Sequence, residues 1–460
     1  MKKKIGFWSI VLLAINSIIG SGIFLSPGAV VQSSGSKALI LYGIAAFFAA
    51  ILAVTFAAAA KYVAHSGAAY IYAKAAFGEH VGFYVGITRY IATCIAWGVM
   101  ATAVVKTVLR IFGFDQNDLM LVTISLILLM LSLLVINCFG PKFFELVNNL
   151  STIGKLAALL VFIIFGIGVI ATTGVNHFAQ IDRLTSAGTN ATLSTLVMGV
   201  IAAFYAFTGF ESVASGADDM DKPEKNLPIA IPLAISVIAV VYIGVVWIAM
   251  MVNPQAMMAT KEVVALVAVF NNPLIQNIVL YGALISMLGI NVAASFHSPR
   301  VLEAIAKQGQ LPSWLAGRTA KNFPLPAFLL TIALAVLLPM AFRYDMTSII
   351  ILSSISRFVQ FLIIPLCVMK FFRGRGDRRL INPARPNVLT DMVCPAVSLI
   401  LTVLLLIKFD WIGQFTILDA NNQHAPNYFA IVAMILGYIV IPFGMMLFNY
   451  QTKKKRYEYD

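Results

Sequence analysis

Long apolar runs recur along almost the whole of this chain and leave room only for short loops. Many of the runs reach the roughly 20 residues that an α-helix needs to cross the hydrocarbon layer of a membrane. Charged residues make up only 11% of the 460 residues, against roughly 25% in a soluble domain. The runs therefore exclude a soluble protein and predict an all-α membrane protein without a second, extramembrane domain.

Apolar runs bounded by charged residues, proline or asparagine define the individual spans. We predict twelve transmembrane helices, at about 7–31, 38–62, 83–112, 120–138, 146–172, 194–217, 227–251, 272–299, 325–341, 346–370, 391–408 and 427–449. Lysine and arginine gather in alternate loops, most densely at 370–385 and 453–456. The positive-inside rule then places both termini in the cytoplasm, which predicts a multi-pass protein of the cytoplasmic membrane.

The net charge of +13 does not indicate a nucleic-acid partner, because the basic residues lie between apolar runs and form no separate basic domain. The lipid bilayer is the expected partner. None of the four cysteines has the spacing of a metal or redox site. The sequence also contains no motif of a zinc protease, a serine hydrolase or a phosphate-binding loop. We therefore expect no cofactor, no metal ion and no enzymatic activity.

Two of the predicted spans contain residues that break a membrane helix. The first span has Gly20-Ser21-Gly22 near its middle, and the sixth has Thr208-Gly209 shortly before Glu211. Freed backbone groups are costly in lipid, so an unwound stretch must face protein, water or a ligand. The alternative is that the small residues only allow close helix packing. Interrupted helices at matching positions of two halves favour an inverted-repeat transporter with its site near the membrane midplane.

The ends of broken helices predict the type of ligand. Helix N-termini present free N–H groups and a positive dipole end, and helix C-termini present free carbonyls. A carboxylate would bind the N–H groups of residues 21–23, and an ammonium would bind the carbonyls near Ile18, Ile19 and Phe207. These two groups together are the head group of an α-amino acid. The predicted substrate-binding residues are Ser17, Ile18, Ile19, Gly20, Ser21, Gly22, Ile23, Tyr205, Phe207, Thr208 and Gly209.

Several separate motifs in matching order make the sequence resemble the amino acid–polyamine–organocation transporter family. The motifs are Ile19-Gly20-Ser21-Gly22-Ile23-Phe24, Phe207-Thr208-Gly209-Phe210-Glu211, Lys222-Pro223-Glu224-Lys225-Asn226-Leu227-Pro228 and Arg300-Val301-Leu302. The resemblance implies two inverted five-helix repeats, at 1–172 and 194–372, with helices 1 and 6 unwound in mid-membrane. It also implies two C-terminal helices at 391–449, a cytoplasmic tail at 450–460, and transport of amino acids or amines by alternating access.

Two charged residues inside the predicted spans are candidates for coupling. Lys155 lies deep in the fifth span, where its ammonium does not easily reach either surface. Some sodium-independent members of the family have a lysine at the matching place, so the resemblance implies that Lys155 replaces a sodium ion; a permanently paired structural lysine is the alternative. Glu211 matches a family glutamate associated with proton coupling. Its alternative role is to accept hydrogen bonds from N–H groups of the sixth-span break.

Arg357, in the tenth span, is a third deep charge. Its guanidinium would either bind an acidic side chain of the substrate or pair with a protein carboxylate or helix carbonyls. We predict that Arg357 and Asn291 either select the substrate by its side chain or form a gate of the pocket. The resemblance implies that Tyr205 and Phe207 line or close the pocket, although packing is the usual role of such residues. We expect Arg89, near a span end, to snorkel to the membrane surface.

The function predicted from these features is secondary active transport of α-amino acids, foremost neutral ones, by a sodium-independent and proton-coupled cycle. An exchanger of one amino acid for another, or for an amine, is the alternative within the same class, with acidic substrates read by Arg357. A transporter-like amino-acid sensor is the alternative of another class. We expect the chain to act as a monomer or a homodimer, with an amino acid and protons as its ligands.

Overall fold

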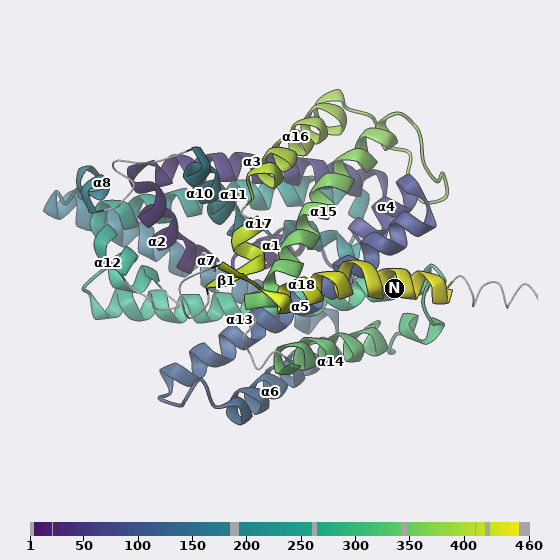
Figure 1. Ribbon diagram of the computed structural model, residues 1–460, viewed down its shortest axis with the longest axis horizontal. Coiled ribbons are helices and arrows are strands. Elements are labelled where there is room, and N and C mark those ends of the chain that lie inside the picture. The colour runs from purple at the N-terminus through teal and green to yellow at the C-terminus, as the bar shows by residue number, and fades with distance from the viewer. Residues whose placement is uncertain are drawn as a thin grey trace, which may run out of the picture.

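Helices account for nearly all of the regular structure of this chain (Figure 1). The computed structural model describes residues 4–20, 22–184, 193–259, 265–341, 347–409, 411–418 and 424–449. Within these residues ten helices are long and apolar enough to cross a membrane, and the shorter apolar helices Phe7–Ile18 and Leu325–Ala341 accompany them. The prediction of an all-α membrane protein is confirmed. The number of twelve spans stays a prediction, and the predicted tail at 450–460 lies outside the described residues.

The first half of the chain contains the first five predicted spans. Its helices are α1 (Phe7–Ile18), α2 (Gly22–Ser34), α3 (Ala38–Tyr62), α4 (Ala69–Phe77), α5 (Glu79–Ile111), α6 (Leu119–Cys138), α7 (Pro141–Thr173) and α8 (Ile181–Leu184). The first predicted span thus consists of two helices, α1 and α2. Glycine or proline marks several of the helix starts, as at Pro141, where a missing N–H group costs nothing in the first turn.

The second half contains the next five predicted spans, and the C-terminal helices follow them. Its elements are α10 (Leu193–Tyr205), the 3₁₀ helix η3 (Phe210–Asp219), α11 (Pro223–Val252), α12 (Pro254–Ala259), α13 (Pro273–Lys307), α14 (Leu325–Ala341), α15 (Thr347–Phe372), α16 (Cys394–Lys408), α17 (Trp411–Phe415), the two-stranded pair β1 (Thr416–Leu418) and β2 (His424–Pro426), and α18 (Tyr428–Ile435). The sixth predicted span thus also consists of two elements, α10 and η3.

The two halves pack into each other rather than side by side. Helix α1 packs against α11, and in the matching relationship α10 packs against α3. Helix α13 packs against α7, while α15 packs against α5. Such reciprocal contacts are what two intertwined repeats would make. The division into repeats at 1–172 and 194–372 stays a prediction.

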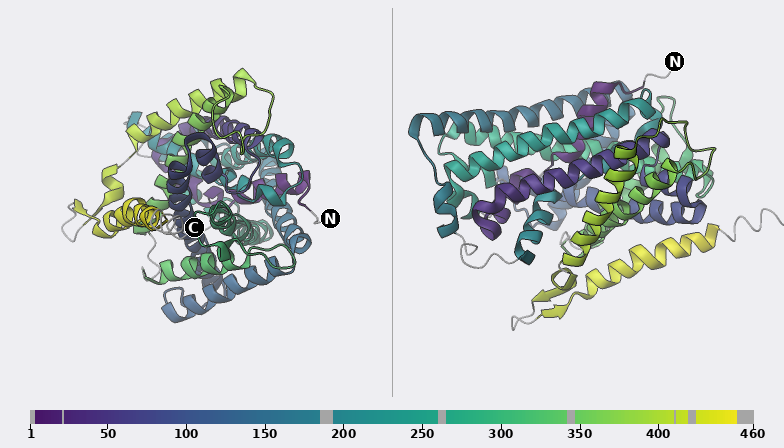
Figure 2. Two further views of the ribbon diagram at one scale, coloured as in Figure 1. Left: turned by 90° about the vertical axis from the view of Figure 1, so that its right-hand side faces the viewer. Right: turned by 90° about the horizontal axis from the view of Figure 1, so that it is seen from above.

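Helices α16 and α18 lie at the edge of the bundle. Figure 2 shows α18, in yellow, along the outside of the molecule. Helix α16 packs on α3 and α15. At its entrance Asp391 accepts hydrogen bonds from Lys61 Nζ at 2.6 Å and from the Tyr62 hydroxyl at 2.8 Å. This contact fixes the start of α16 to the end of α3.

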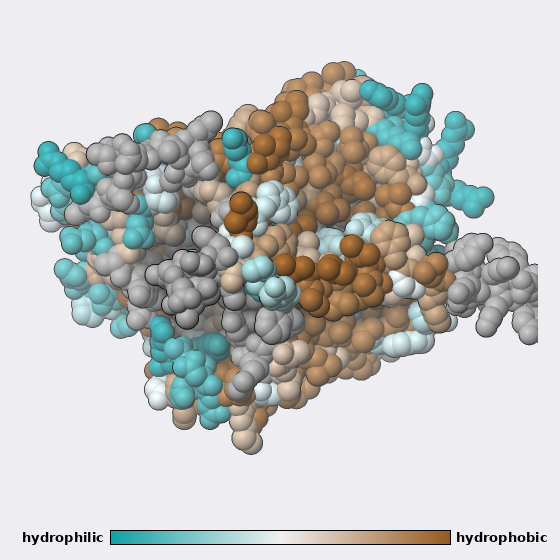
Figure 3. Space-filling view, in the orientation of Figure 1, coloured by the Kyte–Doolittle hydropathy of each residue, from teal (hydrophilic) through white to brown (hydrophobic). Residues whose placement is uncertain are grey.

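The surface matches a protein that spans a membrane. In Figure 3 apolar side chains cover much of the middle of the face shown, and hydrophilic side chains gather toward its two ends. Large apolar side chains that are more than a third exposed occur on most of the long helices, as at Leu128, Ile164 and Val240. In water such exposure would be costly, whereas in lipid it costs nothing, because lipid tails are as apolar as these side chains.

Candidate functional site

The helix of the first predicted span is interrupted between Ile18 and Gly22. Helix α1 ends at Ile18, and Ile19 has an extended backbone with φ −73° and ψ 98°. Helix α2 begins at Gly22. The predicted binding residue Ser21 lies outside the described residues. The last carbonyls of α1 and the first N–H groups of α2 are therefore free of intrahelical bonds at this point.

A second interruption lies between Tyr205 and Phe210. Helix α10 ends at Tyr205, and a turn follows in which Gly209 has φ 127°. This value lies in the region that L side chains rarely adopt, so the turn requires glycine. The hydroxyl of Thr208 caps the end of α10 by donating to the carbonyl of Tyr205 at 2.8 Å.

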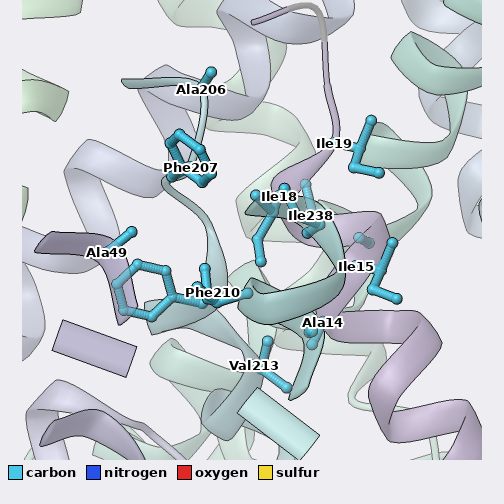
Figure 4. Packing of buried hydrophobic residues seen from close by; sticks show 14 of the residues in the cluster. Ala14, Ile15, Ile18, Ile19, Ala49, Ala206, Phe207, Phe210, Val213 and Ile238 are labelled. Carbon is cyan, nitrogen blue, oxygen red and sulfur yellow. The ribbon is translucent and has the colours of Figure 1, made fainter. Parts of the chain in front are cut away.

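The two interruptions are in direct contact through their backbones. A Cβ atom on Gly209 would lie 2.0 Å from the carbonyl oxygen of Ser17. A Cβ atom on Gly22 would lie 3.1 Å from the Cα atom of Ala206. Figure 4 shows Ala206 and Phe207 on the turn after α10, in the same cluster as Ile18 at the end of α1. The glycines thus allow two main chains to approach where any side chain would separate them.

A pocket with about 740 Å³ of space, including its open side, lies at this contact. Residues of both interruptions line it, and the opposite walls come from α5, α13 and α15. The lining residues are Ser17, Ile18, Gly20, Gly22, Arg89, Thr93, Ala96, Met100, Tyr205, Ala206, Thr208, Gly209, Glu211, Ser212, Ile290, Ala293, Ala294, His297, Ser298 and Arg357. Most of the residues predicted to bind substrate are brought together in this way.

Some predicted residues lie behind the pocket wall rather than on it. Among the described residues, Ile19, Ile23, Phe207 and Asn291 are buried but are not part of the lining. The ring of Phe207 packs against that of Tyr242, with centroids 5.1 Å apart. Aromatic packing is thus its observed contact. Tyr205, in contrast, is half exposed and does line the pocket.

Glu211 is fully buried at the start of η3 and faces two guanidinium groups. Its Oε2 atom accepts a hydrogen bond from the N–H group of Gly209 at 2.7 Å, so it satisfies a donor that the break set free. Its Oε1 atom lies 3.3 Å from Arg357 Nε and 3.6 Å from an outer nitrogen of Arg89. Glu211 thus accepts a hydrogen bond from an N–H group of the sixth-span break, which was its alternative role. Arg357 pairs with a protein carboxylate, which was the alternative to binding a substrate side chain.

Arg89 is the clearest departure from the sequence-based expectation. It does not snorkel to a surface: the residue is only 8% exposed, and its guanidinium donates to the Ser212 hydroxyl at 2.5 Å. The expectation was wrong because α5 begins at Glu79, earlier than the apolar run indicated, which places Arg89 well inside the helix. Arg89, on α5, thus approaches the same carboxylate as Arg357, on α15.

Lys155 is fully buried on α7, next to the first interruption. Its ammonium donates to the carbonyl of Ile19 at 2.5 Å and lies 3.3 Å and 3.4 Å from the carbonyls of Asn16 and Ser286. The hydroxyl of Ser286 donates to the carbonyl of Ile19 as well, at 3.0 Å. The carbonyl of Ile19 is therefore already bonded on the side away from the pocket.

His297 is a pocket residue that the sequence reasoning did not single out. Its Nε2 atom lies 2.7 Å from the Ser17 hydroxyl, which also donates to the carbonyl of Leu13 at 2.7 Å. Since the hydroxyl has one hydrogen, the imidazole must donate from Nε2 and carry a bare Nδ1 when it is neutral. The sequence did contain an indication of this site, because His297 is a polar residue within the apolar run of α13.

A charged network lies at the end of the bundle that carries the N-terminal residues. Asp219 accepts from Arg300 Nε at 2.7 Å and from Arg318 at 2.6 Å, and Arg318 also forms a bidentate pair with Glu303. Burial lowers the pKa of the Arg318 guanidinium, but its bonds to these two carboxylates outweigh burial and raise that pKa above its usual value. The backbone of Ile5 bonds to that of Asp219 beside it. The network joins the N-terminal segment, η3, α13 and the following loop.

An all-α membrane protein with a polar pocket between two interrupted helices has an architecture that suits a membrane transporter. The sequence profile of the amino acid permease family matches residues 5–441. The chain therefore belongs to this family of membrane transporters, and its resemblance to the amino acid–polyamine–organocation family is confirmed.

Individual relatives agree with this assignment. An uncharacterized transporter of Mycobacterium tuberculosis is 39% identical, over 98% of this chain and 96% of the relative. The methylthioribose transporter of Bacillus subtilis is 25% identical, over 69% of this chain and 70% of the relative. The serine/threonine exchanger SteT of Bacillus subtilis is 26% identical, over 82% of this chain and 86% of the relative.

Proposed function

We propose that this chain is a secondary active transporter that carries α-amino acids across the cytoplasmic membrane by alternating access. The observation that supports this function best is the pocket between the two interrupted helices, where Gly22 of one break packs against Ala206 of the other. In this proposal the chain crosses the membrane twelve times, helices 1 and 6 are unwound at the midplane, and both termini lie in the cytoplasm. The charged network around Asp219 then closes the cytoplasmic end.

The head group of the amino acid binds to main-chain groups of the two breaks. Its carboxylate lies at the start of α2, where the N–H groups from Gly22 onward and the positive helix dipole favour an anion. Because Lys155 and Ser286 already bond to the Ile19 carbonyl, the ammonium is left with the carbonyl of Ile18 and the turn at 206–209. Binding at both breaks makes the ligand sensitive to any change in their relative position.

Coupling passes through Lys155 in this proposal and does not need sodium. Three backbone carbonyls surround the Lys155 ammonium at the end of α1, and oxygen ligands of this kind would otherwise suit a hard cation. A lysine ammonium at this place supplies the positive charge permanently or by taking up a proton. A proton-linked cycle is our first candidate.

An exchange cycle is the second candidate, since one relative is described as a serine/threonine exchanger. It would use the same pocket and the same alternating access. The two cycles differ in what drives uptake: an inward proton gradient in the first, and unlabelled amino acid inside the vesicle in the second.

Reconstituted proteoliposomes test both the function and its coupling. Uptake of labelled amino acids is measured with an imposed proton gradient, with internal unlabelled amino acid, or with neither. Stimulation by the gradient supports symport, and stimulation only by internal amino acid supports exchange. Methylthioribose, which has no zwitterionic head group, serves as the comparison ligand. Uptake of methylthioribose with no uptake of any amino acid would refute the proposal.

A further inference from the structure

We propose that the substrate of this pocket has an acidic side chain, so that the transported amino acid is an α-amino dicarboxylic acid such as aspartate or glutamate. The proposal rests on the transport function proposed above and specifies its substrate. It starts from the charges that surround the pocket: two guanidinium groups, of Arg89 and Arg357, face a single carboxylate, that of Glu211.

The pocket holds this positive excess within a largely buried environment. The side chains of Arg89 and Arg357 are 10% and 17% exposed, and that of Glu211 is not exposed at all. Arginine does not lose its proton in a protein, so neither guanidinium is able to relieve the cost of burial by becoming neutral. A buried charge without a counter-ion is expensive. The two guanidinium groups and one carboxylate therefore leave a site for one further negative charge.

Arg357 keeps hydrogen-bond donors for such a ligand. Its Nε atom is buried and has no hydrogen-bond partner among the described residues, and the same holds for Glu211 Oε1. The 3.3 Å approach of these two atoms is thus an ion pair without good hydrogen-bond geometry. The ring of Tyr205 lies 5.4 Å from the guanidinium and supports it from one side. The planar guanidinium presents several N–H donors, so it is suited to bind a carboxylate through two bonds.

The other described residues of the lining do not supply the missing charge. Thr93, Ser212 and Ser298 are neutral, and His297 is bound to Ser17. Lys155 lies outside the lining and is held by backbone carbonyls. It adds positive rather than negative charge to this region.

The charge balance then selects the substrate class. The ammonium and carboxylate of an α-amino acid cancel each other, so a neutral amino acid leaves the excess of the pocket unchanged. A second carboxylate on the side chain adds one negative charge and offers two oxygen atoms to Arg357. The structure thus favours acidic substrates, the alternative that Arg357 suggested, over the neutral ones expected first from the sequence.

The test compares near-isosteric acid and amide ligands in the same proteoliposomes. Uptake of glutamate is compared with that of glutamine, and uptake of aspartate with that of asparagine, for the wild-type chain. Since a hydrogen bond to a charged group contributes enough free energy for about a tenfold change in affinity or more, the acids are expected to be preferred over the amides by at least about tenfold. This comparison requires no variant and therefore does not depend on whether a mutant folds.

A variant identifies the residue responsible. Arg357→Gln should lose most of the preference for glutamate over glutamine, whereas Lys106→Gln, which removes a lysine of α5 that does not line the pocket, should keep it. Uptake of neutral amino acids with no preference for acids would overturn this inference and leave the proposed function standing. Uptake of no amino acid at all would overturn both. An acid preference that survives Arg357→Gln unchanged would overturn the role of Arg357.

Discussion

The ammonium of Lys155 lies 2.5 Å from the carbonyl oxygen of Ile19, the first residue beyond the end of α1. A helix that ends inside a membrane protein leaves carbonyls that need donors. Lys155 supplies one of these donors from a different helix, and it also carries a positive charge to the negative end of the α1 dipole. The position of the first break is thus linked directly to the state of this lysine.

Lys155→Ala should abolish accumulation of substrate against a gradient. The substitution removes one donor from three carbonyls, of which that of Ile19 keeps the Ser286 hydroxyl. The lost hydrogen bonds should lower the free energy of unfolding by about 1–3 kcal/mol. Uptake in proteoliposomes and thermal unfolding in detergent measure the two effects. Lys142→Ala, which removes an exposed lysine from the first turn of the same helix, is the matched control. Accumulation at the wild-type level in Lys155→Ala would remove this residue from the coupling mechanism.

Gly209→Ala should lower uptake and stability more than a methyl group added at Gly22, the other glycine where the two breaks meet. The new Cβ atom would lie 2.0 Å from the Ser17 carbonyl oxygen, and φ is 127°. A non-glycine residue in such a conformation costs on the order of 1–3 kcal/mol even without the clash. We expect lost uptake and a lower midpoint of thermal unfolding.

Gly168→Ala is the control for this substitution. Gly168 lies within α7, and a Cβ atom there would meet nothing within 4 Å. Replacing glycine by alanine inside a helix should stabilise the chain by about 0.5–1 kcal/mol. If Gly209→Ala transported as well as Gly168→Ala, the close approach of the two breaks would not be needed for function.

Asp219→Asn should weaken the charged network near the N-terminus. The carboxylate is bonded to both Arg300 and Arg318, and an amide satisfies them less well. Hydrogen bonds to charged groups contribute about 1.5–3 kcal/mol each, so the midpoint of thermal unfolding should fall by several degrees. Asp221→Asn, at an exposed position two residues later, should leave it unchanged. Equal midpoints for the two variants would show that the network adds nothing to stability.

Ser17→Ala and His297→Ala should act as a coupled pair. The hydroxyl of Ser17 joins the imidazole of His297 to α1, so either substitution breaks the same contact and should raise the apparent KM for uptake. Residues that share a contact have non-additive effects. The double variant should therefore be little worse than the poorer single variant. Fully additive losses in KM would indicate that the two residues contribute separately.

The apolar middle parts of the long helices could be predicted well, because hydropathy determines which segments cross the membrane. The spans expected at 38–62 and 325–341 have the bounds of α3 and α14. The ends of other helices were missed where polar residues continue a helix. Helix α13 runs on to Lys307 because Arg300 and Glu303 have partners on other segments. These partners are distant in the sequence, so a helix end that depends on them cannot be predicted from the local pattern.

The candidate site could be predicted in part for a similar reason. Glycine and small polar residues mark a broken helix locally, and the pocket indeed has Gly20, Gly22 and Gly209 on its wall. Whether a side chain on those segments faces the pocket depends on packing against other helices, which placed Phe207 against Tyr242. Arg89 was misjudged because the apolar run begins later than the helix does.

The segment before α1 and the end of η3 are joined by main-chain pairing, in which Ile5 bonds to both Asp219 and Asp221. At the opposite end, Ser17 of α1 touches Gly209 just before η3. Helix α1 and η3 are thus joined at both of their ends, so a displacement of one segment strains its contacts with the other. In the proposed transport cycle these two segments are therefore expected to move together.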